Sequence, residues 1–381
     1  MTYSPRFTYT ADMLAAAADL GAYQAIIATL PLPLGVERTL RRESRVRVAH
    51  NSTWIENRTL ALDDAAAVIA DKALRDPSRQ REQAATEVRN YFQALRFIDL
   101  HPDAACDETF IGRLHALIMR GGASGRPKER SAYRQDNLKV GNFVYVPPAW
   151  EDVPALMADL AAWATGPGLE LPRPVFAAIL AYQFVTIHPF HDGNGRTCRA
   201  LATWALRGPD DQHAVDALGL LNVEEFYAAD LEGYYGALQM GLHFSYYDAN
   251  QRGSRSDPDL TPWIGYVLGM LSRSARQVRG AVVERFQASH ADLLRDPVAA
   301  WDRTFRRLLV SLPDPTAPFG PADIVEHLLV SDRTARTWLQ DWHEAGLIVP
   351  SRPGAVRVHT WGVAPTVAAT LAQQRREAPH A

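Results

Sequence analysis

The chain is poor in cysteine, in long apolar runs and in charge imbalance, and each shortage excludes a class of protein. Only 2 cysteines, Cys106 and Cys198, occur in 381 residues, which excludes a disulfide framework as the basis of the fold. No apolar run approaches the roughly 20 residues of a membrane-spanning helix, and no apolar leader with a cleavage site opens the sequence. The net charge of −3 gives no general attraction to nucleic acid or anionic membranes. We therefore expect a cytoplasmic protein without a membrane partner.

The remaining composition is that of an ordinary globular protein, with 47% hydrophobic and 22% charged residues. A length of 381 residues suffices for two or three domains of about 150 residues each. Apolar residues recur at helical spacing along most of the sequence, which predicts a mainly α fold. The arginine-rich stretch from 34 to 56, which includes Arg45, is predicted to be helical with a solvated basic face.

The most informative residues run from His188 to Arg199 and read His-Pro-Phe-His-Asp-Gly-Asn-Gly-Arg-Thr-Cys-Arg. Apolar-periodic segments at 174–187 and 200–206 flank them, so a tight loop between two helices is predicted. Gly193 and Gly195 leave the backbone free to direct N–H groups toward one point. That point lies where the second helix begins, a position that binds phosphate well.

The side chains of this loop supply what chemistry at a nucleotide phosphate needs. Arg196 and Arg199 are three residues apart, so they share one face of the second helix and can both reach polyphosphate oxygens. Asp192 is a hard oxygen ligand suited to Mg²⁺ beside phosphates, and His188 can accept a proton near neutral pH. A metal hydrolase with His188, His191 and Asp192 as ligands is the rival interpretation, but no spacing pattern links a further histidine to the loop.

These residues resemble the signature of the Fic-domain family, H-x-F-x-[DE]-G-N-G-R-x-x-R, at every defining position. Three more segments are similar to parts of the same family: 87–95 to the helix ahead of its core, 140–148 to its β-hairpin flap and 259–263 to its closing helix. The resemblance covers residues 30 to 275 or so. It implies a nucleotidyltransferase that moves AMP from ATP to a Ser, Thr or Tyr hydroxyl of a target protein, with Mg²⁺ as the metal.

The resemblance also implies residue roles. His188 takes the proton of the target hydroxyl, Asp192 holds Mg²⁺ on the α- and β-phosphates, and Arg199 takes the γ-phosphate. The implied nucleotide-binding residues are Phe190, Gly193, Asn194, Gly195, Arg196, Arg199 and Tyr235. Among them, Phe190 is expected to anchor the loop in the core and Tyr235 to contact adenine. In the flap, Val140, Gly141 and Tyr145 are expected to align the target by β-augmentation.

A segment upstream is similar to the inhibitory motif of the same family, [ST]-x-x-x-E-[GN], at Ser52, Glu56 and Asn57. A carboxylate delivered by Glu56 to Arg199 would form a charge-assisted pair where the γ-phosphate should lie. ATP would then bind out of line for attack, and a misplacement of about 1 Å can cost on the order of 100-fold in rate. The motif precedes the core, as in the family class that is inhibited by its own N-terminal helix.

Four parts are predicted along the chain. These are an N-terminal helical region (1–104) with the inhibitory motif at 52–57, a Fic helical bundle (105–275) with the flap at 140–148, a connecting helix with a proline-rich linker (276–320) and a C-terminal winged-helix domain (321–381). In the last part, Ser331 is expected to cap a recognition helix that begins at Asp332, and Gly346 to end it. Short strands are expected at 347–349 and 356–359.

The charge of this C-terminal part disfavours nucleic acid as its partner. From Phe319 to Trp361, four arginines stand against five acidic residues, a net charge of −1. A DNA-binding domain normally carries a basic surface, so a role in protein interaction or in structure is favoured.

Two rival functions remain open. The same pocket could remove AMP or transfer another phosphate-linked group, with Glu56 aligning a water molecule. Alternatively, the chain is a DNA-binding regulator whose Fic core only senses ATP. The sequence leaves open the identity of the target protein, self-modification included, and the oligomeric state, a homodimer included.

Overall fold

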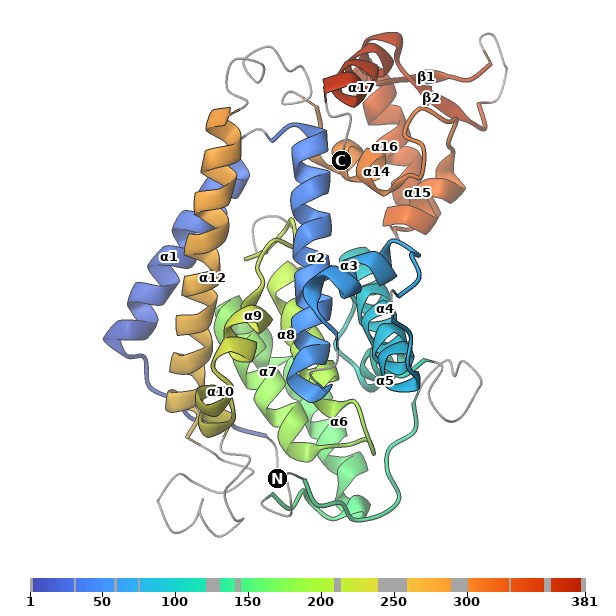
Figure 1. The fold of residues 1–381 in the computed structure, drawn as a ribbon. Helices are drawn as coiled ribbons and strands as arrows, with labels where there is room; N and C mark the ends of the chain where they lie inside the picture. The colour runs from blue at the N-terminus through green and yellow to red at the C-terminus, as the bar shows by residue number, and fades with distance from the viewer. Residues whose placement is uncertain are drawn as a thin grey trace. The chain divides into compact units, whose positions relative to one another are not determined.

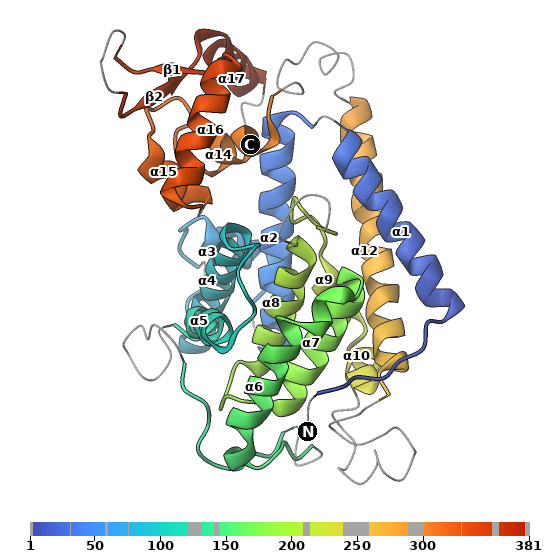
Figure 2. The same cartoon turned by 180° about the vertical axis from the view of Figure 1, so that it is seen from behind.

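Helices dominate the structure, a computed structural model, and this confirms the prediction of a mainly α fold (Figures 1 and 2). The structure describes residues 3–30, 32–57, 60–74, 76–120, 131–140, 145–208, 214–238, 259–288, 301–328, 330–352 and 358–377. The chain divides into two compact units, Met1–Ala25 with Glu43–Arg279 and Ile26–Arg42 with Gly280–Ala381. Their boundaries fall inside three helices: α1 (Ala11–Thr29), α2 (Leu34–Asn57) and α12 (Thr261–Ala288).

The first unit is built around α7 (Arg173–Ile187), in which every residue from Val175 to Ile187 is buried. A helix that is hydrophobic on all sides belongs in the interior of a protein, and α7 packs against α6 (Val153–Ala164) and α8 (Asn194–Arg207). The unit also contains α3 (Leu62–Ile69), α4 (Arg79–Leu100), α5 (Glu108–Ile118), η1 (Trp150–Asp152), η2 (Pro167–Glu170), α9 (Val223–Ala229) and α10 (Leu231–Leu238). Helix α4 contacts α3, α5 and α8. The stretch from 188 to 199 therefore joins two helices of the core.

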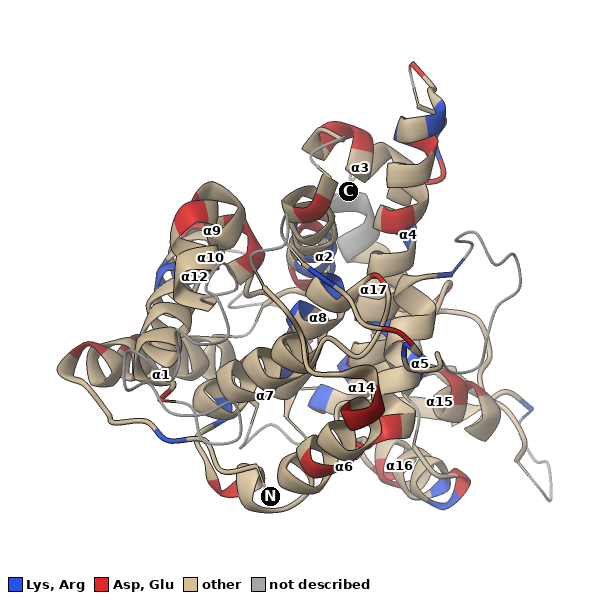
Figure 3. Ribbon diagram, turned by 90° about the horizontal axis from the view of Figure 1, so that it is seen from below, with Lys and Arg blue, Asp and Glu red and all other residues tan. Residues whose placement is uncertain are grey.

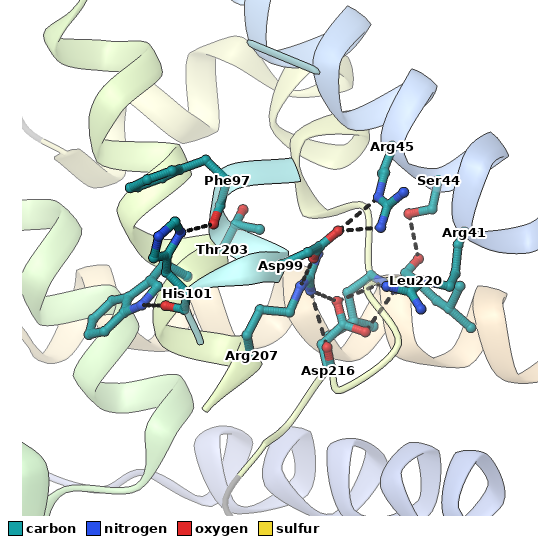
Figure 4. A network of polar contacts seen from close by, with 12 residues as sticks. Arg41, Ser44, Arg45, Phe97, Asp99, His101, Thr203, Arg207, Asp216 and Leu220 are labelled. Atoms are coloured by element: carbon teal, nitrogen blue, oxygen red, sulfur yellow. Dashed lines mark hydrogen bonds and ion pairs between the residues drawn. The ribbon is translucent and has the colours of Figure 1, made fainter. Parts of the chain in front are cut away.

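A network of ion pairs ties α2, α4 and α8 together (Figure 4). Arg207, at the end of α8, donates through Nε to Asp99 Oδ1 at 2.9 Å and pairs through Nη1 with the carboxylate of Asp216. Arg45 on α2 donates through Nε to Asp99 Oδ2 at 2.8 Å, so the prediction of a solvated basic face is wrong for this residue. Removing one partner of a buried pair costs about 3–5 kcal/mol, because the other charge stays buried. The network thus fixes this part of α2 against α4 and α8.

The second unit holds the C-terminal elements. They are α14 (Arg303–Ser311), α15 (Pro321–Leu328), α16 (Asp332–Glu344), β1 (Ile348–Pro350), β2 (Trp361–Val363) and α17 (Pro365–Glu377). Phe305, Phe319 and Trp342 are among the buried residues of its core. The predicted cap is confirmed, because Ser331 Oγ accepts a hydrogen bond from the N–H group of Thr334 at 3.1 Å. The predicted end of this helix is also confirmed: Gly346 follows α16 with a φ of 70°.

The two strands pair antiparallel, with Ile348 opposite Val363. The second strand was expected at 356–359. Residues 358 and 359 lie outside any strand, β2 lies at 361–363, and the rest of the prediction falls in 353–357, outside the described residues. Trp361 exchanges two backbone hydrogen bonds with Phe319, of 2.7 and 2.8 Å, and this contact with a buried segment sets the position of the strand. The proline-rich stretch 313–321, predicted as a linker, lies within the second unit.

Charges of both signs occur along α16 (Figure 3). Arg336 Nε donates to Asp332 Oδ2 at 2.7 Å, one turn earlier on the same helix. This pairing offsets the positive charge that a recognition helix would offer to DNA. Within the described residues, no helix combines the length and the apolar character needed to cross a bilayer.

Candidate functional site

The backbone makes two left-handed turns at the candidate site. Helix α7 ends at His188, which has φ 52° and ψ 57°, and α8 begins after Gly193, which has φ 77°. A left-handed conformation is costly for a residue with a β-carbon, so His188 keeps it only because its surroundings hold it there. The chain thereby leaves one buried helix and enters the next within six residues, so His188 and the N-terminus of α8 lie at the two ends of one short turn.

Asn194 and Phe190 hold this turn together by hydrogen bonds within the loop. The side chain of Asn194 accepts from the N–H group of Phe190 at 3.0 Å and donates to the carbonyl of the same residue at 2.7 Å. Phe190 is buried, and its ring stacks on that of His115 at 3.7 Å between centroids. The expectation that Phe190 anchors the loop agrees with this placement. Both side chains and the backbone polar groups of Phe190 are therefore occupied within the protein.

His188 is held as a neutral base. Its Nδ1 lies 3.2 Å from the carbonyl oxygen of Val185, which assigns the hydrogen to Nδ1 and leaves Nε2 with a free electron pair. Burial is the main cause that lowers the pKa of His188 to about 4. The imidazole is therefore unprotonated at neutral pH and can accept a proton through Nε2.

Asp192 is the carboxylate of the loop. Its side chain is 72% exposed, and its Oδ1 accepts from the N–H group of Gly193 at 2.6 Å and lies 3.4 Å from Arg196 Nη2. Mg²⁺ in nucleotide sites is usually bound by one or two carboxylates, with phosphate and water oxygens completing the shell. One exposed carboxylate beside a helix N-terminus fits that donor set.

The described residues do not supply a metal site made of protein ligands alone. Among them, no group of three or more His, Cys, Asp or Glu side chains is placed to hold a metal ion. His191, a ligand in the rival hydrolase interpretation, instead lies with its Nε2 3.4 Å from the exposed Asp136.

The structure brings the upstream motif to the loop. Arg199 Nη2 lies 2.7 Å from Glu56 Oε1, and the same guanidinium donates to Ser52 Oγ at 2.9 Å and to the Ser52 carbonyl at 2.7 Å. A β-carbon at Gly195 would overlap Glu56 Oε1, so the carboxylate lies directly against the first turn of α8. Arg199 is almost fully buried and also contacts the hydroxyl of Tyr234 at 3.4 Å. The carboxylate thus occupies the region where the sequence predicted a phosphate.

The remaining predicted residues have separate environments. Tyr235 on α10 is 42% exposed, whereas its neighbour Tyr234 is the tyrosine that reaches Arg199. Val140 and Tyr145 form an antiparallel bridge with backbone bonds of 2.9 and 3.2 Å, while Gly141 lies outside the described residues. The side chain of Tyr145 is buried, and its hydroxyl donates to the Thr186 carbonyl at 2.6 Å.

Cys198 lies between the two arginines of α8 and is a packing residue. Its thiol is buried, and burial is the main cause that raises its pKa to about 11. The thiol donates to the Gly195 carbonyl at 3.0 Å. A neutral, buried thiol is a poor nucleophile, in line with the expectation from the sequence.

Three residues that sequence reasoning missed hold the loop in place. Arg134 is buried and donates to the carbonyls of His188 at 2.9 Å, Asp136 at 2.9 Å and Pro148 at 2.6 Å. His115 Nε2 lies 2.8 Å from the Asp192 carbonyl, and its Nδ1 lies 2.6 Å from Ser131 Oγ. The third residue is Glu87 on α4, whose carboxylate contacts Arg196 Nη1 at 3.2 Å. No spacing pattern could have found them, because their partners lie far away in the sequence.

The sequence model of the Fic/DOC family matches residues 105–206. A protein adenylyltransferase Fic from Nematostella vectensis is 29% identical over 161 residues, which are 42% of this chain and 37% of that protein. A protein adenylyltransferase fic-1 from Caenorhabditis briggsae is 31% identical over 171 residues, 43% of this chain and 32% of the relative. The chain thus spans about a third of the length of the curated relatives it matches.

Solved structures of other proteins share the fold of this chain. A Fic family protein from Desulfovibrio desulfuricans G20 has a TM-score of 0.58 at 26% identity, over 95% of this chain and 99% of that protein. Fic-1 from C. elegans (aa134–508) has a TM-score of 0.52 at 22% identity over 71% of this chain and 75% of that protein, which shows the fold alone. With the family match and the geometry of the loop, these likenesses lead to one identification: the chain contains a Fic/DOC domain, at residues 105–206.

Proposed function

We propose that the protein is a protein adenylyltransferase, a nucleotidyltransferase that moves AMP from ATP to a Ser, Thr or Tyr hydroxyl of a target protein. The observation that carries the proposal is the loop itself: the Val185 carbonyl holds His188 Nδ1, which leaves Nε2 to accept a proton, and the loop leads directly into α8 with its two buried arginines. Relatives that match less than half of this chain carry the name protein adenylyltransferase. Self-modification would be a special case of the same reaction.

In the proposed reaction, His188 Nε2 takes the proton of the target hydroxyl. The hydroxyl oxygen forms a bond to the α-phosphorus, the bond from that phosphorus to the bridging oxygen breaks, and pyrophosphate leaves with the electron pair. The backbone N–H group of Gly195, in the first turn of α8, together with Arg196, stabilises the charge on the phosphate oxygens. Asp192 would hold Mg²⁺, which when bound neutralises phosphate charge. Such a transfer depends mainly on positioning and charge stabilisation, and this loop supplies both.

We further propose that Glu56 inhibits the enzyme from within the same chain. Arg199 is the implied partner of the γ-phosphate, and its Nη2 is paired with Glu56 at 2.7 Å. A triphosphate that binds beside this carboxylate meets a second negative charge, so its γ-phosphate is displaced and the α-phosphate is out of line for attack. Ser52 supports this pair, because its hydroxyl and its carbonyl both accept hydrogen bonds from the Arg199 guanidinium.

For the C-terminal residues 321–381, we propose a winged-helix domain that binds protein rather than nucleic acid. Support comes from the order α15, α16, β1, β2 and from the pairing of Arg336 with Asp332 on α16. A gel shift on genomic fragments at two salt concentrations tests this choice, since DNA binding driven by phosphate contacts weakens steeply with salt. A salt-dependent shift at physiological ionic strength would favour the regulator instead.

The reaction is tested with ATP labelled at the α-phosphate, in parallel with ATP labelled at the γ-phosphate. Each is incubated with Mg²⁺, cell lysate and wild-type protein or its Glu56→Gly and His188→Ala variants. We expect protein-bound label only from the α-labelled ATP, more of it with Glu56→Gly and none with His188→Ala. Label from the γ-phosphate would indicate phosphate transfer, and loss of label from pre-modified protein, dependent on Glu56, would indicate AMP removal.

A further inference from the structure

One carboxylate oxygen outside the loop contacts both the inhibitory segment and the loop. Glu87 Oε2 on α4 accepts a hydrogen bond from Asn57 Nδ2 at 2.5 Å and lies 3.2 Å from Arg196 Nη1. The other oxygen, Oε1, accepts from the exposed side chain of Gln83 at 3.3 Å. The side chain of Glu87 is only 18% exposed. Its position between the two segments is therefore set by these contacts rather than by solvent.

Arg196 depends on Glu87 for its position. Its side chain is 5% exposed, Nη1 contacts Glu87, and Nη2 lies 3.4 Å from Asp192 and 3.6 Å from the sulfur of Met119. Its Nε is buried without a hydrogen-bond partner in the described part of the chain. Asp192 itself is mostly exposed, so Glu87 supplies the closer and better shielded of the two charge contacts. Without Glu87 the guanidinium would be free to turn away from the N-terminus of α8.

The same carboxylate restrains the inhibitory helix. Asn57 is the last residue of α2 and directly follows Glu56. A bond that holds Asn57 on Glu87 therefore limits how far Glu56 can move from Arg199. The two contacts, Glu56 to Arg199 and Asn57 to Glu87, close the end of α2 over the loop from two sides.

We propose that Glu87 is a positioning residue with two roles: it aligns Arg196 for the phosphate groups, and it latches the end of α2 over the site. The inference rests on the proposed AMP transfer and its inhibition by Glu56. When α2 moves away, Asn57 leaves Glu87, but Arg196 keeps it. Loss of the hydrogen bond between Asn57 and Glu87 must then raise the rate of AMP transfer, whereas loss of the contact between Glu87 and Arg196 must lower it.

Two variants separate the roles. Asn57→Ala removes the latch and keeps the Glu87 to Arg196 pair, so AMP transfer should rise by about tenfold, as for one charge-assisted hydrogen bond. Glu87→Gln removes the charge that aligns Arg196 and is measured in the Glu56→Gly background, where the latch no longer matters. There kcat for label transfer from α-labelled ATP to lysate protein should fall by about tenfold, with the KM for ATP unchanged. Gln83→Ala is the matched control, because Gln83 contacts the same carboxylate from its exposed side. This variant should change neither the AMP transfer rate of the wild type nor kcat in the Glu56→Gly background.

A second measurement reads the latch without any catalysis. Amide hydrogen exchange of the last turn of α2, residues 52–57, should become at least about threefold faster in Asn57→Ala and remain unchanged in Gln83→Ala. Faster exchange with no AMP transfer by any variant would sink the proposed function and leave the latch standing. Unchanged exchange in Asn57→Ala overturns the latch. If Glu87→Gln raises kcat or leaves it unchanged in the Glu56→Gly background, the alignment of Arg196 by Glu87 is overturned.

Discussion

Removing the carboxylate of Glu56 is the most direct test of how this site is controlled. Glu56→Gly should raise AMP transfer by at least about tenfold, because Arg199 Nη2 loses its carboxylate partner at 2.7 Å and the N–H that held it becomes available to the γ-phosphate. A hydrogen bond to a charged group is worth about 1.5–3 kcal/mol. The side chain of Glu56 is 35% exposed, and solvent screening reduces that figure. A residual difference of about 1.4 kcal/mol corresponds to a factor of ten in rate.

The assay compares initial rates of label transfer from α-labelled ATP, at saturating Mg²⁺, for the wild type and two variants. Glu56→Gln keeps the shape of the side chain and loses its charge, so it should reproduce most of the increase if charge is the cause. Arg199→Ala should not mimic either variant, because it removes the block and the γ-phosphate contact together. A Glu56→Gly protein no faster than wild type would refute the autoinhibition. One that loses an AMP-removing activity would make Glu56 a working residue of the reverse reaction.

Four further outcomes follow from the geometry. His188→Ala should lower AMP transfer by about 10²–10⁴-fold with the circular dichroism spectrum unchanged, and near wild-type modification would refute its role as base. Since burial lowers the pKa of His188 to about 4, the transfer rate should stay level from neutral pH down to mildly acidic pH and fall only as the pH approaches that value. A pH–rate profile whose midpoint lies near the ordinary pKa of histidine would contradict the buried neutral state. Asp192→Ala should abolish the dependence of the rate on Mg²⁺ concentration, and an unchanged metal titration would place the ligand elsewhere. Arg134→Met leaves three backbone carbonyls without their donor, so urea unfolding should show a loss of at least about 2 kcal/mol, and a loss below about 1 kcal/mol would contradict its role as a clamp.

The sequence by itself determined the parts of the site that depend on neighbours along the chain. The apolar segments around 188–199 and the glycines between them predicted a turn between two helices, and α7 and α8 flank it. The spacing of Arg196 and Arg199 placed them on one helical face, because residues three apart lie one above the other. Ser331 as a cap and Gly346 as a helix end were found in the same way, since capping is decided within a few residues.

Only the tertiary structure decided which distant groups meet these residues. The family resemblance, and not any spacing in the chain, implied that Glu56 reaches Arg199 across 143 positions, whereas nothing in the sequence indicated that Arg134 and Glu87 reach the loop. Their contacts arise because α7 and α8 are buried in the core and other helices must pack around them, at positions that no periodicity encodes. The position of β2 was missed for the same reason, since Trp361 exchanges backbone hydrogen bonds with the remote Phe319. Residue type and spacing therefore determine the chemistry of the loop, whereas packing between remote segments determines which charges hold it and restrain it.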